Sequence, residues 1–355
     1  MAETLVVAGA GMAGLAAAAR ARELGADVVV HEKGDRPGGS MRLSSGVVWR
    51  YREWERFRAE CPGGDPELQR AVWEGLDDAL AWLEALGAPV LVRETGNPVT
   101  TGVRFDVRGL TETLARRAGT LRAGEPLAAL PDGVPVVLAT GGFQGDLELV
   151  RRHVTPEAAA LVLRANPWSA GDGLRLALAR GAGLSAGMDE FYGRNLAAAP
   201  RIEPGDFVPL AQVYARHATV ENVLGERYEA RTWSEVDVAQ WTARQPGARA
   251  WYLVSDAALS EPVRERTVGD AIAAAEHAGA PVERRGGTTR VEVVAGITTT
   301  LGGILVDARG RAAAGLWAAG ADAGGVSTGG WSSALAAALV LGRIAAEDAV
   351  GPASR

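Results

Sequence analysis

A glycine-rich turn near the start of the chain restricts the possible folds more than any other feature. The apolar run 4–8 (TLVVA) leads into the turn 9–14 (GAGMAG), and an alanine-rich segment that favours a helix covers 15–24. A second apolar run over 28–30 then ends at His31 and Glu32. Strand, turn, helix and strand in this order predict a βαβ unit of a parallel sheet.

The turn has the pattern G-x-G-x-x-G, in which each glycine has a mechanical purpose. Gly9 permits the tight turn, Gly11 lets the backbone approach a pyrophosphate, and Gly14 lets the helix pack closely against the strand. The N–H groups at the start of the helix, at Met12 and Ala13, are then available to phosphate. The motif predicts a dinucleotide site, but by itself it does not distinguish FAD from NAD.

An acidic residue and several small residues after the second strand extend this site. Glu32 stands 18 residues after Gly14, where a carboxylate can accept hydrogen bonds from ribose hydroxyls. A glycine pair then allows a loop to lie flat against a pyrophosphate and ribityl chain, and residues with hydroxyl groups follow it. The residues expected to contact the cofactor in this segment are Lys33, Gly38, Gly39, Ser40, Met41, Ser45 and Gly46.

Further motifs follow along the rest of the chain. They are LATGGF at 138–143, GDG at 171–173, GERY at 225–228, TLGG at 300–303 with Val306-Asp307 after it, and GLWAAGAD at 315–322. With these motifs and the first one, the chain resembles the FAD-dependent family of fumarate reductases, succinate dehydrogenase flavoprotein subunits, 3-ketosteroid dehydrogenases and tricarballylate-type dehydrogenases. The resemblance spans nearly the whole chain.

The resemblance implies an α/β fold with a Rossmann-type FAD-binding domain, a parallel sheet with helices, in two sequence segments. These are 1–189 and 291–355, with an α+β cap (substrate) domain inserted at 190–290. Asp322 would bind the ribityl hydroxyls. A helix over 334–350 would direct its N-terminus at the flavin, where its dipole stabilises the anionic reduced form. The other residues implied at the FAD are Thr140, Gly141, Gly142, Asp172, Gly302, Gly320, Gly329, Gly330, Ser333 and Leu335.

The chain departs from the fumarate reductases at the positions that hold the substrate. Those enzymes bind a dicarboxylate with cationic side chains, and the corresponding positions here are Thr299, Ser327 and about Ser260. Each lost charge-assisted hydrogen bond removes about 1.5–3 kcal/mol, so we expect the substrate not to be a small dicarboxylate. Arg264 or Arg266, a few residues beyond Ser260, is the alternative source of a cation.

Histidine and cysteine usage limits how the cofactor is held. Relatives that attach FAD covalently do so through a histidine near the glycine-serine segment, and no histidine lies between Lys33 and Cys61. We therefore expect non-covalent FAD. Cys61 is the single cysteine, and there is no Cys/His cluster of the zinc-binding kind, so neither an internal disulfide nor a metal is expected.

Four side chains are the candidates for catalysis. Arg194 can bind an oxygen or relay a proton, and Tyr192 can exchange a proton or form an aromatic wall. The hydroxyls of Thr299 and Thr300 can orient a substrate but are poor bases, so the base must come from the cap. Beyond them, residues 214–217 are expected to form a strand.

Three functions remain open on the sequence alone. The first is a dehydrogenase or reductase that acts on a C–C bond by hydride transfer at flavin N5. The second is an oxidase that passes electrons to O₂, and the third is a protein that holds flavin without turnover of its own. Loss of flavin colour on anaerobic addition of a substrate distinguishes the first two from the third, and rapid re-oxidation in air identifies the oxidase.

The overall charge bears on the partners of the chain. The net charge is −6, which argues against nucleic acid or an anionic membrane surface. No signal peptide and no uncharged apolar run long enough to span a membrane is evident. We expect a cytoplasmic protein whose partners are a small-molecule substrate and an electron acceptor or donor that the sequence does not identify.

Overall fold

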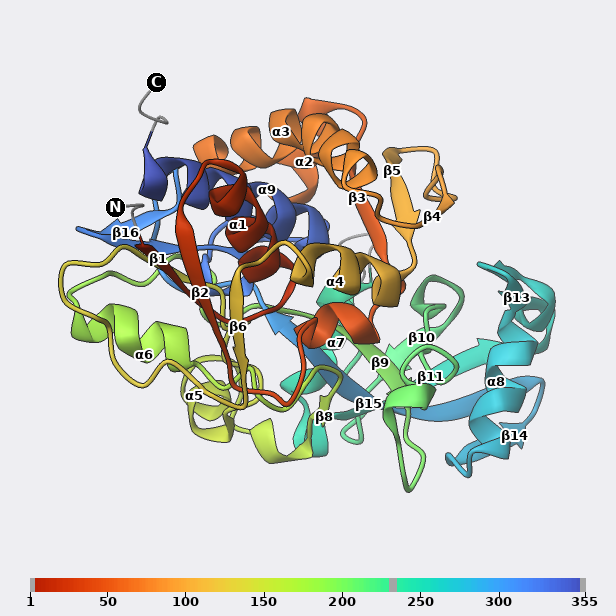
Figure 1. Ribbon diagram of the computed structural model, residues 1–355. Helices are drawn as coiled ribbons and strands as arrows, with labels where there is room; N and C mark the ends of the chain where they lie inside the picture. The colour runs from red at the N-terminus through yellow and green to blue at the C-terminus, as the bar shows by residue number, and fades with distance from the viewer. Residues whose placement is uncertain (1–3, 230–234, 352–355) are drawn as a thin grey trace. The chain divides into compact units, whose positions relative to one another are not determined.

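The computed structural model describes residues 4–229 and 235–351 (Figure 1), and the chain forms two compact units. Unit 1 comprises Met1–Asp146, Asn166–Glu190 and Thr300–Arg355. Unit 2 comprises Leu147–Ala165 and Phe191–Thr299. The chain therefore enters unit 2 twice and returns to unit 1 each time.

Unit 1 contains a six-stranded sheet in the order β16, β17, β7, β1, β2, β6. Five of these strands run parallel to their neighbours, and β16 lies antiparallel to β17 at one edge. The pairing of β1 with β2 after a single helix confirms the predicted βαβ unit. The strands are β1 (Thr4–Ala8), β2 (Asp27–Glu32), β6 (Thr120–Ala123), β7 (Val136–Leu138), β16 (Arg311–Ala313) and β17 (Leu316–Ala318).

Two helices rich in small residues pack against each other beside this sheet. They are α1 (Met12–Glu23) and α9 (Ala334–Val350), which lie side by side in Figure 1. Their backbones come so close that a Cβ added to Gly342 would lie 2.4 Å from the carbonyl oxygen of Ala13. The alanine-rich composition thus serves close helix packing. The helix predicted over 334–350 is confirmed.

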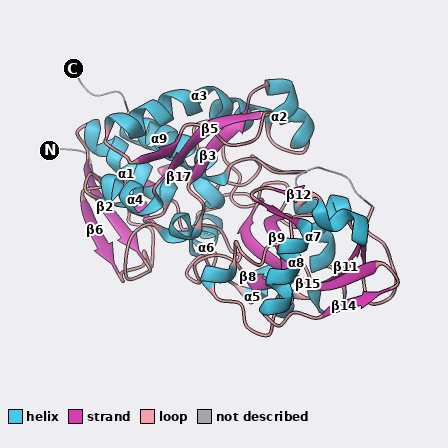
Figure 2. Ribbon diagram, turned by 90° about the vertical axis from the view of Figure 1, so that its right-hand side faces the viewer, coloured by secondary structure: helices cyan, strands magenta, loops and turns pink. Residues whose placement is uncertain are grey.

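Unit 1 also contains a second, antiparallel sheet in the order β3, β5, β4, of which β3 and β5 are labelled near α3 in Figure 2. Its longest helix, α3, begins where the Asp65 side chain accepts hydrogen bonds from two backbone N–H groups and Pro66 occupies the first turn. The strands are β3 (Val47–Tyr51), β4 (Val90–Val92) and β5 (Thr100–Phe105). The helices are α2 (Trp54–Glu60), α3 (Pro66–Ala85), α4 (Val107–Ala115) and α6 (Asp172–Ala179), with short 3₁₀ turns η1 (Gly39–Leu43) and η7 (Gly320–Asp322).

Unit 2 is organised around one long strand, β15, with which β8, β9, β11 and β14 all pair. Its core is built from apolar residues of the sheet and of α8, with Tyr214 and Tyr252 in edge-to-face contact at 5.5 Å between ring centroids. The strands are β8 (Val162–Leu163), β9 (Phe191–Ala197), β10 (Thr219–Glu221), β11 (Arg249–Ser255), β12 (Pro262–Val263), β13 (Arg266–Thr267), β14 (Val282–Arg285) and β15 (Thr288–Thr300). The helices are α5 (Leu147–His153), α7 (Val236–Ala243) and α8 (Val268–His277).

The strand expected over 214–217 is wrong. Residues Ala215–His217 form a 3₁₀ turn, closed by a hydrogen bond from the N–H of His217 to the carbonyl of Tyr214. Tyr214 itself is fully buried and donates its hydroxyl hydrogen to Gln212. Burial of this one tyrosine, and not strand alternation, sets the local conformation.

Within the described residues, no helix combines the length and the apolar character needed to cross a bilayer.

Candidate functional site

The carboxyl ends of four parallel strands of unit 1 lie at one edge of the sheet. β1 ends before Gly9, β2 ends at Glu32, β7 ends before Thr140, and β17 ends before Gly320. Because parallel strands all end at the same edge, motifs from four distant parts of the sequence come together there. This edge is where open α/β sheets bind their ligands.

The three glycines of the first motif differ in what a side chain would meet. A Cβ at Gly9, whose φ is +102°, would lie 2.2 Å from the carbonyl oxygen of Ala139, and one at Gly14 would lie 1.9 Å from that of Gly9. A Cβ at Gly11 would meet no other residue within 4 Å. Gly9 and Gly14 are thus required by the fold, whereas Gly11 leaves open space beside the start of α1.

The N-terminus of α1 faces that space without a competing group. Gly11 is its N-cap, no side chain caps it, and its first turn contains no acidic residue. Met12 and Ala13 are the first two residues of α1, so their N–H groups belong to its first turn. An uncapped helix start beside an open glycine is an arrangement that fits a pyrophosphate.

Glu32 braces the turn from the end of β2. Its buried carboxylate accepts hydrogen bonds from the N–H of Ala10 and of Gly34, both at 2.7 Å. The carbonyl of Ala10 in turn accepts from the N–H of Gly38 at 2.7 Å. The acidic residue expected at the ribose therefore also fixes the conformation of both glycine turns.

The second group of small residues faces the first. Gly38 and Gly39 both have positive φ, and a Cβ at Gly39 would lie 3.4 Å from the Cα of Gly11. The hydroxyl of Ser40 accepts hydrogen bonds from the backbone and the side-chain amide of Asn166. Asn166 was not among the predicted residues. Met41 is buried in η1, while Ser45 and Gly46 precede β3, Ser45 being exposed.

Asp322 is buried against the second glycine turn. Its carboxylate accepts hydrogen bonds from the N–H of Thr140 at 2.5 Å and of Gly142 at 2.9 Å, and also from the Thr140 hydroxyl. Burial raises the pKa of Asp322 above its ordinary value, although these donors oppose the shift. Asp322 thus ties the turn Thr140–Gly142 to η7, the position implied for a ribityl-binding acid.

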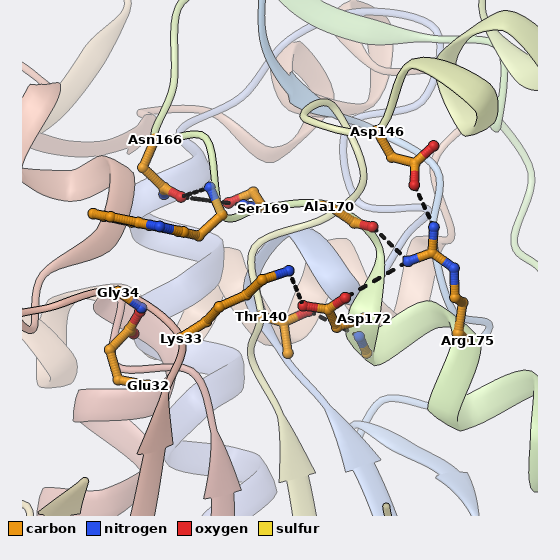
Figure 3. A network of polar contacts seen from close by, with 12 residues as sticks. Glu32, Lys33, Gly34, Thr140, Asp146, Asn166, Ser169, Ala170, Asp172 and Arg175 are labelled. Atoms are coloured by element: carbon orange, nitrogen blue, oxygen red, sulfur yellow. Dashed lines mark hydrogen bonds and ion pairs between the residues drawn. The ribbon is translucent and has the colours of Figure 1, made fainter. Parts of the chain in front are cut away.

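A network of charged side chains closes the side of the site near the end of β2 (Figure 3). Lys33 forms an ion pair with Asp172, the first residue of α6, at 2.7 Å. Arg175, one turn further along α6, contacts Asp172 and Asp146. Trp168 lies against Gly34, where an added Cβ would come within 2.8 Å of its ring. Trp168 was also missed by the sequence analysis.

The remaining predicted cofactor residues lie before and at the start of α9 and after β15. Ser333 caps α9 by accepting from the N–H of Ala336, and Leu335 is half-buried in its first turn. Gly302 packs so closely on Met188 that a Cβ would lie 2.4 Å from its nitrogen. All the cofactor residues expected from the sequence thus belong to unit 1.

Taken together, the edge of the sheet has the shape and chemistry that FAD requires. Glycines leave backbone open beside the start of α1, this helix start is free of side-chain caps, and the carboxylates of Glu32 and Asp322 hold the two glycine turns in shape. The donor set is suited to phosphate and hydroxyl groups, so the residues present fit the cofactor.

A different kind of cluster lies in unit 2, around Tyr192. Tyr192 and Arg194 are two residues apart on β9 and therefore share a face of the strand, and the guanidinium carbon of Arg194 lies 5.2 Å from the centre of the Tyr192 ring. Arg164 and Arg194 are both hydrogen-bonded to the Tyr192 side chain. Arg164 is fixed from behind by Thr298 and by the carbonyl of Phe207, both at 3.0 Å.

The charges of this cluster change the acidity of the tyrosine. Burial alone would raise the pKa of Tyr192, but Arg194, Arg164 and Arg264 together lower it below the ordinary value of a phenol. Burial lowers the pKa of Arg164 and of Arg264, since each guanidinium is desolvated and lies near another cation. Three arginines around one phenol favour an anionic oxygen at this position.

Backbone strain is concentrated in the same cluster. Among the described residues, the non-glycine residues with positive φ are Glu235 (57°), Ala248 (53°) and Arg264 (58°). Two of them, Glu235 and Arg264, are among the charges that act on each other and on Arg194. Strained residues gather at functional sites when the surrounding structure holds them in place.

Most of the other positions predicted to contact the substrate contribute no charged side chain to the cluster around Tyr192. Thr299 and Thr300 end β15, and Ser260 ends a 3₁₀ turn without a cation at its position. Of the two alternatives to Ser260, Arg266 binds the carbonyls of Pro209 and Ala211 and so has a structural role. Arg264 is the one that joins Tyr192 and Arg194.

Comparison with known proteins agrees with this geometry. The FAD binding domain family matches residues 4–135 and 132–333. No curated protein sequence matches this chain significantly.

Among solved structures, the chain is similar to the open conformation of a flavocytochrome c3 fumarate reductase, with 22% identity, a TM-score of 0.73, and coverage of 100% of this chain and 79% of that one. It is also similar to a 3-ketosteroid-Δ4-(5α)-dehydrogenase from Rhodococcus jostii RHA1, with 19% identity, a TM-score of 0.70, and coverage of 98% and 97%. A 3-ketosteroid Δ1-dehydrogenase from Sterolibacterium denitrificans gives 16% identity, a TM-score of 0.71, and coverage of 98% and 99%. At these identities the likeness concerns the fold. The chain belongs to the FAD binding domain family, and its α/β fold is similar to those of a fumarate reductase and of two 3-ketosteroid dehydrogenases.

Proposed function

We propose that this flavoprotein is a dehydrogenase or reductase that acts on a C–C bond next to one carbonyl or carboxylate oxygen of an organic substrate. The observation that carries the proposal is the Tyr192 phenol among Arg164, Arg194 and Arg264. A phenol whose pKa is lowered by fixed cations gives up its proton more readily than an ordinary tyrosine, which suits a role in proton transfer. Side chains without a function would not need to be desolvated together in this way, with one of them, Arg264, in a strained backbone conformation.

The roles of the residues follow from their charges. FAD, when bound, supplies hydride transfer at its N5. In the oxidative direction, Tyr192 as phenolate takes the proton from the carbon beside the one that loses hydride, and a C=C bond forms. In the reductive direction, Tyr192 as phenol returns that proton. Arg194 and Arg264 hold an adjacent carbonyl or carboxylate oxygen and stabilise the negative charge that develops on it.

The positions of the cations limit the charge of the substrate. The expectation that the substrate site had lost positive charge counted Thr299, Ser327 and about Ser260, and it overlooked Arg164. Ser327 is buried and shares a 2.6 Å hydrogen bond with Ser332, so its position contributes a neutral hydroxyl pair. Arg164 is already held by Thr298 and by the Phe207 carbonyl, and the Tyr192 phenolate offsets one further positive charge, so the cluster suits one acidic oxygen of a substrate. We therefore propose a substrate that is not a small dicarboxylate.

The test is anaerobic reduction of the bound flavin, followed by its visible absorbance. From a broad panel of compounds, we expect an enolisable ketone, or the saturated precursor of an unsaturated acid, to bleach the bound flavin. We expect no useful reduction of fumarate when a strong artificial donor supplies the electrons. Tyr192→Phe should lower the bleaching rate by about 100-fold or more, with unchanged flavin content. Tyr228→Phe, which removes another phenol of unit 2 that bonds Asp237, is the matched control.

Each other outcome points to a different function. Efficient turnover of fumarate would refute the substrate class. Rapid re-oxidation of the bleached flavin in air would identify an oxidase, and no bleaching by any compound would favour a flavin-holding protein without turnover.

We also propose that FAD is held without a covalent bond, because no histidine lies in the segment between Lys33 and Cys61. Acid precipitation of the yellow protein should release all of its flavin as FAD. Flavin that stays with the precipitated polypeptide would contradict this.

A further inference from the structure

The loop 324–330, called here the glycine loop, leads into α9 and is held from one side by residues just before α3 and in its first turns. The N–H of Asp65 donates to the carbonyl of Gly325 at 2.8 Å, and the N–H of Gly63 donates to that of Thr328 at 3.1 Å. The buried side-chain amide of Gln69 donates to the carbonyl of Val326 at 2.8 Å. These contacts satisfy carbonyl groups of the loop and leave its N–H groups to other partners.

A second set of contacts comes from the segment 185–190, the last part of unit 1 before β9. A Cβ on Gly187, whose φ is +74°, would lie 2.8 Å from the Thr328 side chain. One on Gly324 would lie 2.1 Å from the Ser185 hydroxyl, so in each contact the backbone of a glycine packs against a side chain of the other segment. Gly325 also donates its N–H to the carbonyl of Leu301 at 3.1 Å.

Glu190 supplies the charged contact in this arrangement. Its carboxylate accepts the N–H of Gly329 at 2.6 Å. Its own backbone is fixed on both sides, since its N–H donates to Gly187 at 2.9 Å and its carbonyl accepts from Leu301 at 3.0 Å. Glu190 is also the residue after which the chain leaves unit 1, to return at Thr300.

The loop needs such a contact because glycine alone does not define its shape. Gly329 has φ +83°, and Gly330 is packed so tightly that a Cβ would lie 1.7 Å from the carbonyl oxygen of Glu60. Glycine pairs have more conformational freedom than other residues. A hydrogen bond to a carboxylate is shorter and stronger than one between neutral groups. The bond from Gly329 to Glu190 therefore restricts the part of the loop closest to α9.

We propose that Glu190 is a positioning residue for the cofactor: by holding the Gly329 N–H, it keeps the glycine loop and the start of α9 in the conformation that binds FAD. The inference rests on the proposed place of Gly329, Gly330 and Ser333 at the FAD. It is independent of the substrate and of the direction of the reaction. A carboxylate that acted only in folding would instead stabilise the apoprotein without changing its affinity for FAD.

The test compares the apoproteins of three variants with the wild type. FAD dissociation constants are measured by quenching of flavin fluorescence on titration, and thermal midpoints are measured on the same flavin-free samples. Glu190→Ala should bind FAD about tenfold or more weakly, the order expected for one lost charge-assisted hydrogen bond, with an unchanged apoprotein midpoint. Glu190→Gln retains an oxygen acceptor and should stay within about threefold of the wild type. Glu94→Ala, the loss of an exposed carboxylate elsewhere in unit 1, is the control and should change neither quantity.

Three results would overturn the proposal. The first is wild-type affinity in Glu190→Ala. The second is a Glu190→Gln variant as weak as Glu190→Ala. The third is a Glu190→Ala apoprotein that melts early or does not fold, since the role is then structural. Because FAD binding is read without turnover, failure of the dehydrogenase proposal leaves this result intact, and the reverse also holds.

Discussion

Unit 1 and unit 2 build their candidate sites from different chemical groups. In unit 1 the site consists mainly of exposed backbone, which glycines such as Gly11 and Gly39 leave open, together with a helix start without a side-chain cap. In unit 2 it consists of long side chains around Tyr192. A backbone site binds a cofactor whose phosphates and sugars are always the same, whereas a side-chain site can differ between relatives that act on different substrates.

The largest effect is expected at the glycines of the first motif. Gly11→Val should weaken FAD binding by about 100-fold or more, because the branched side chain fills the open space beside α1. The apoprotein should still fold, since a Cβ at Gly11 meets nothing within 4 Å. Flavin content and thermal midpoint are the two measurements.

Gly14→Val is the matched variant. Its Cβ would lie 1.9 Å from the carbonyl oxygen of Gly9, so it should lower the stability of the apoprotein itself. If Gly11→Val keeps normal flavin content, residues 9–14 do not hold the cofactor and the contrast between the two units is lost.

The sequence predicts unit 1 well because its signals are local. The spacing of Gly9, Gly11 and Gly14 is set within one turn, and it follows directly from the steric needs of that turn. The partners that were missed lie far away along the chain: Asn166 bonds Ser40 across 126 positions. Such a contact has no periodic or compositional signal in a single sequence.

The sequence predicts unit 2 less well because its site is assembled from distant segments. Arg164, Tyr192 and Arg264 come from three separate parts of the chain, and nothing in their neighbours indicates that they meet. The left-handed backbone of Arg264 is imposed by its surroundings, since arginine has no preference for it. The prediction of a strand over 214–217 failed for the same reason, because burial of Tyr214 outweighs the alternating pattern of the local sequence.

The second prediction concerns the cations of unit 2. Arg264→Met should lower kcat/KM for the substrate found by anaerobic screening by about 100-fold, because a charge aimed at a developing anion is removed. Flavin content should not change. The pKa of Tyr192 should rise, so its phenolate absorbance at 295 nm should appear at higher pH than in the wild type.

Arg266→Met is the control for this prediction. Arg266 binds two backbone carbonyls, so its loss should lower the stability of the protein and leave the pKa of Tyr192 unchanged. A variant at Arg264 with full activity would show that the cluster is structural and that unit 2 does not carry the chemistry.

The third prediction is a pH dependence of stability. Burial raises the pKa of Glu235 to about 7, and Arg194 is the largest of the opposing influences. A carboxyl group with a raised pKa stabilises the folded state below its unfolded pKa of 4.5, and this contribution is lost as the pH rises through about 7. Above pH 7, the free energy of unfolding of Glu235→Gln should therefore exceed that of the wild type by up to about 3 kcal/mol, and its thermal midpoint should be higher.

The advantage of Glu235→Gln should shrink steadily as the pH falls from 7 towards 4.5, the window given by the two pKa values. Thermal melts across this range measure it. A stability difference between Glu235→Gln and the wild type that does not depend on pH would show that the carboxyl group does not titrate in this window. It would also weaken the view that the site of unit 2 is built from charged side chains that act on one another.

The smallest effect is expected at the ion pair of Lys33 with Asp172, which tests how far unit 1 relies on its backbone. The pair is partly exposed, with 38% and 32% of the two side chains accessible, and such pairs contribute about 0–1 kcal/mol to stability. Lys33→Met should therefore leave the thermal midpoint nearly unchanged and weaken FAD binding by about threefold, a loss that high salt should abolish since salt screens exposed charges.

Arg36→Met, which removes a more exposed cation of the same segment paired with Asp35, is the control and should change neither quantity. A loss of more than about tenfold that persists in high salt would mean that Lys33 holds the cofactor directly. Unit 1 would then depend on a charged side chain as unit 2 does, and the distinction between the two sites would be one of degree.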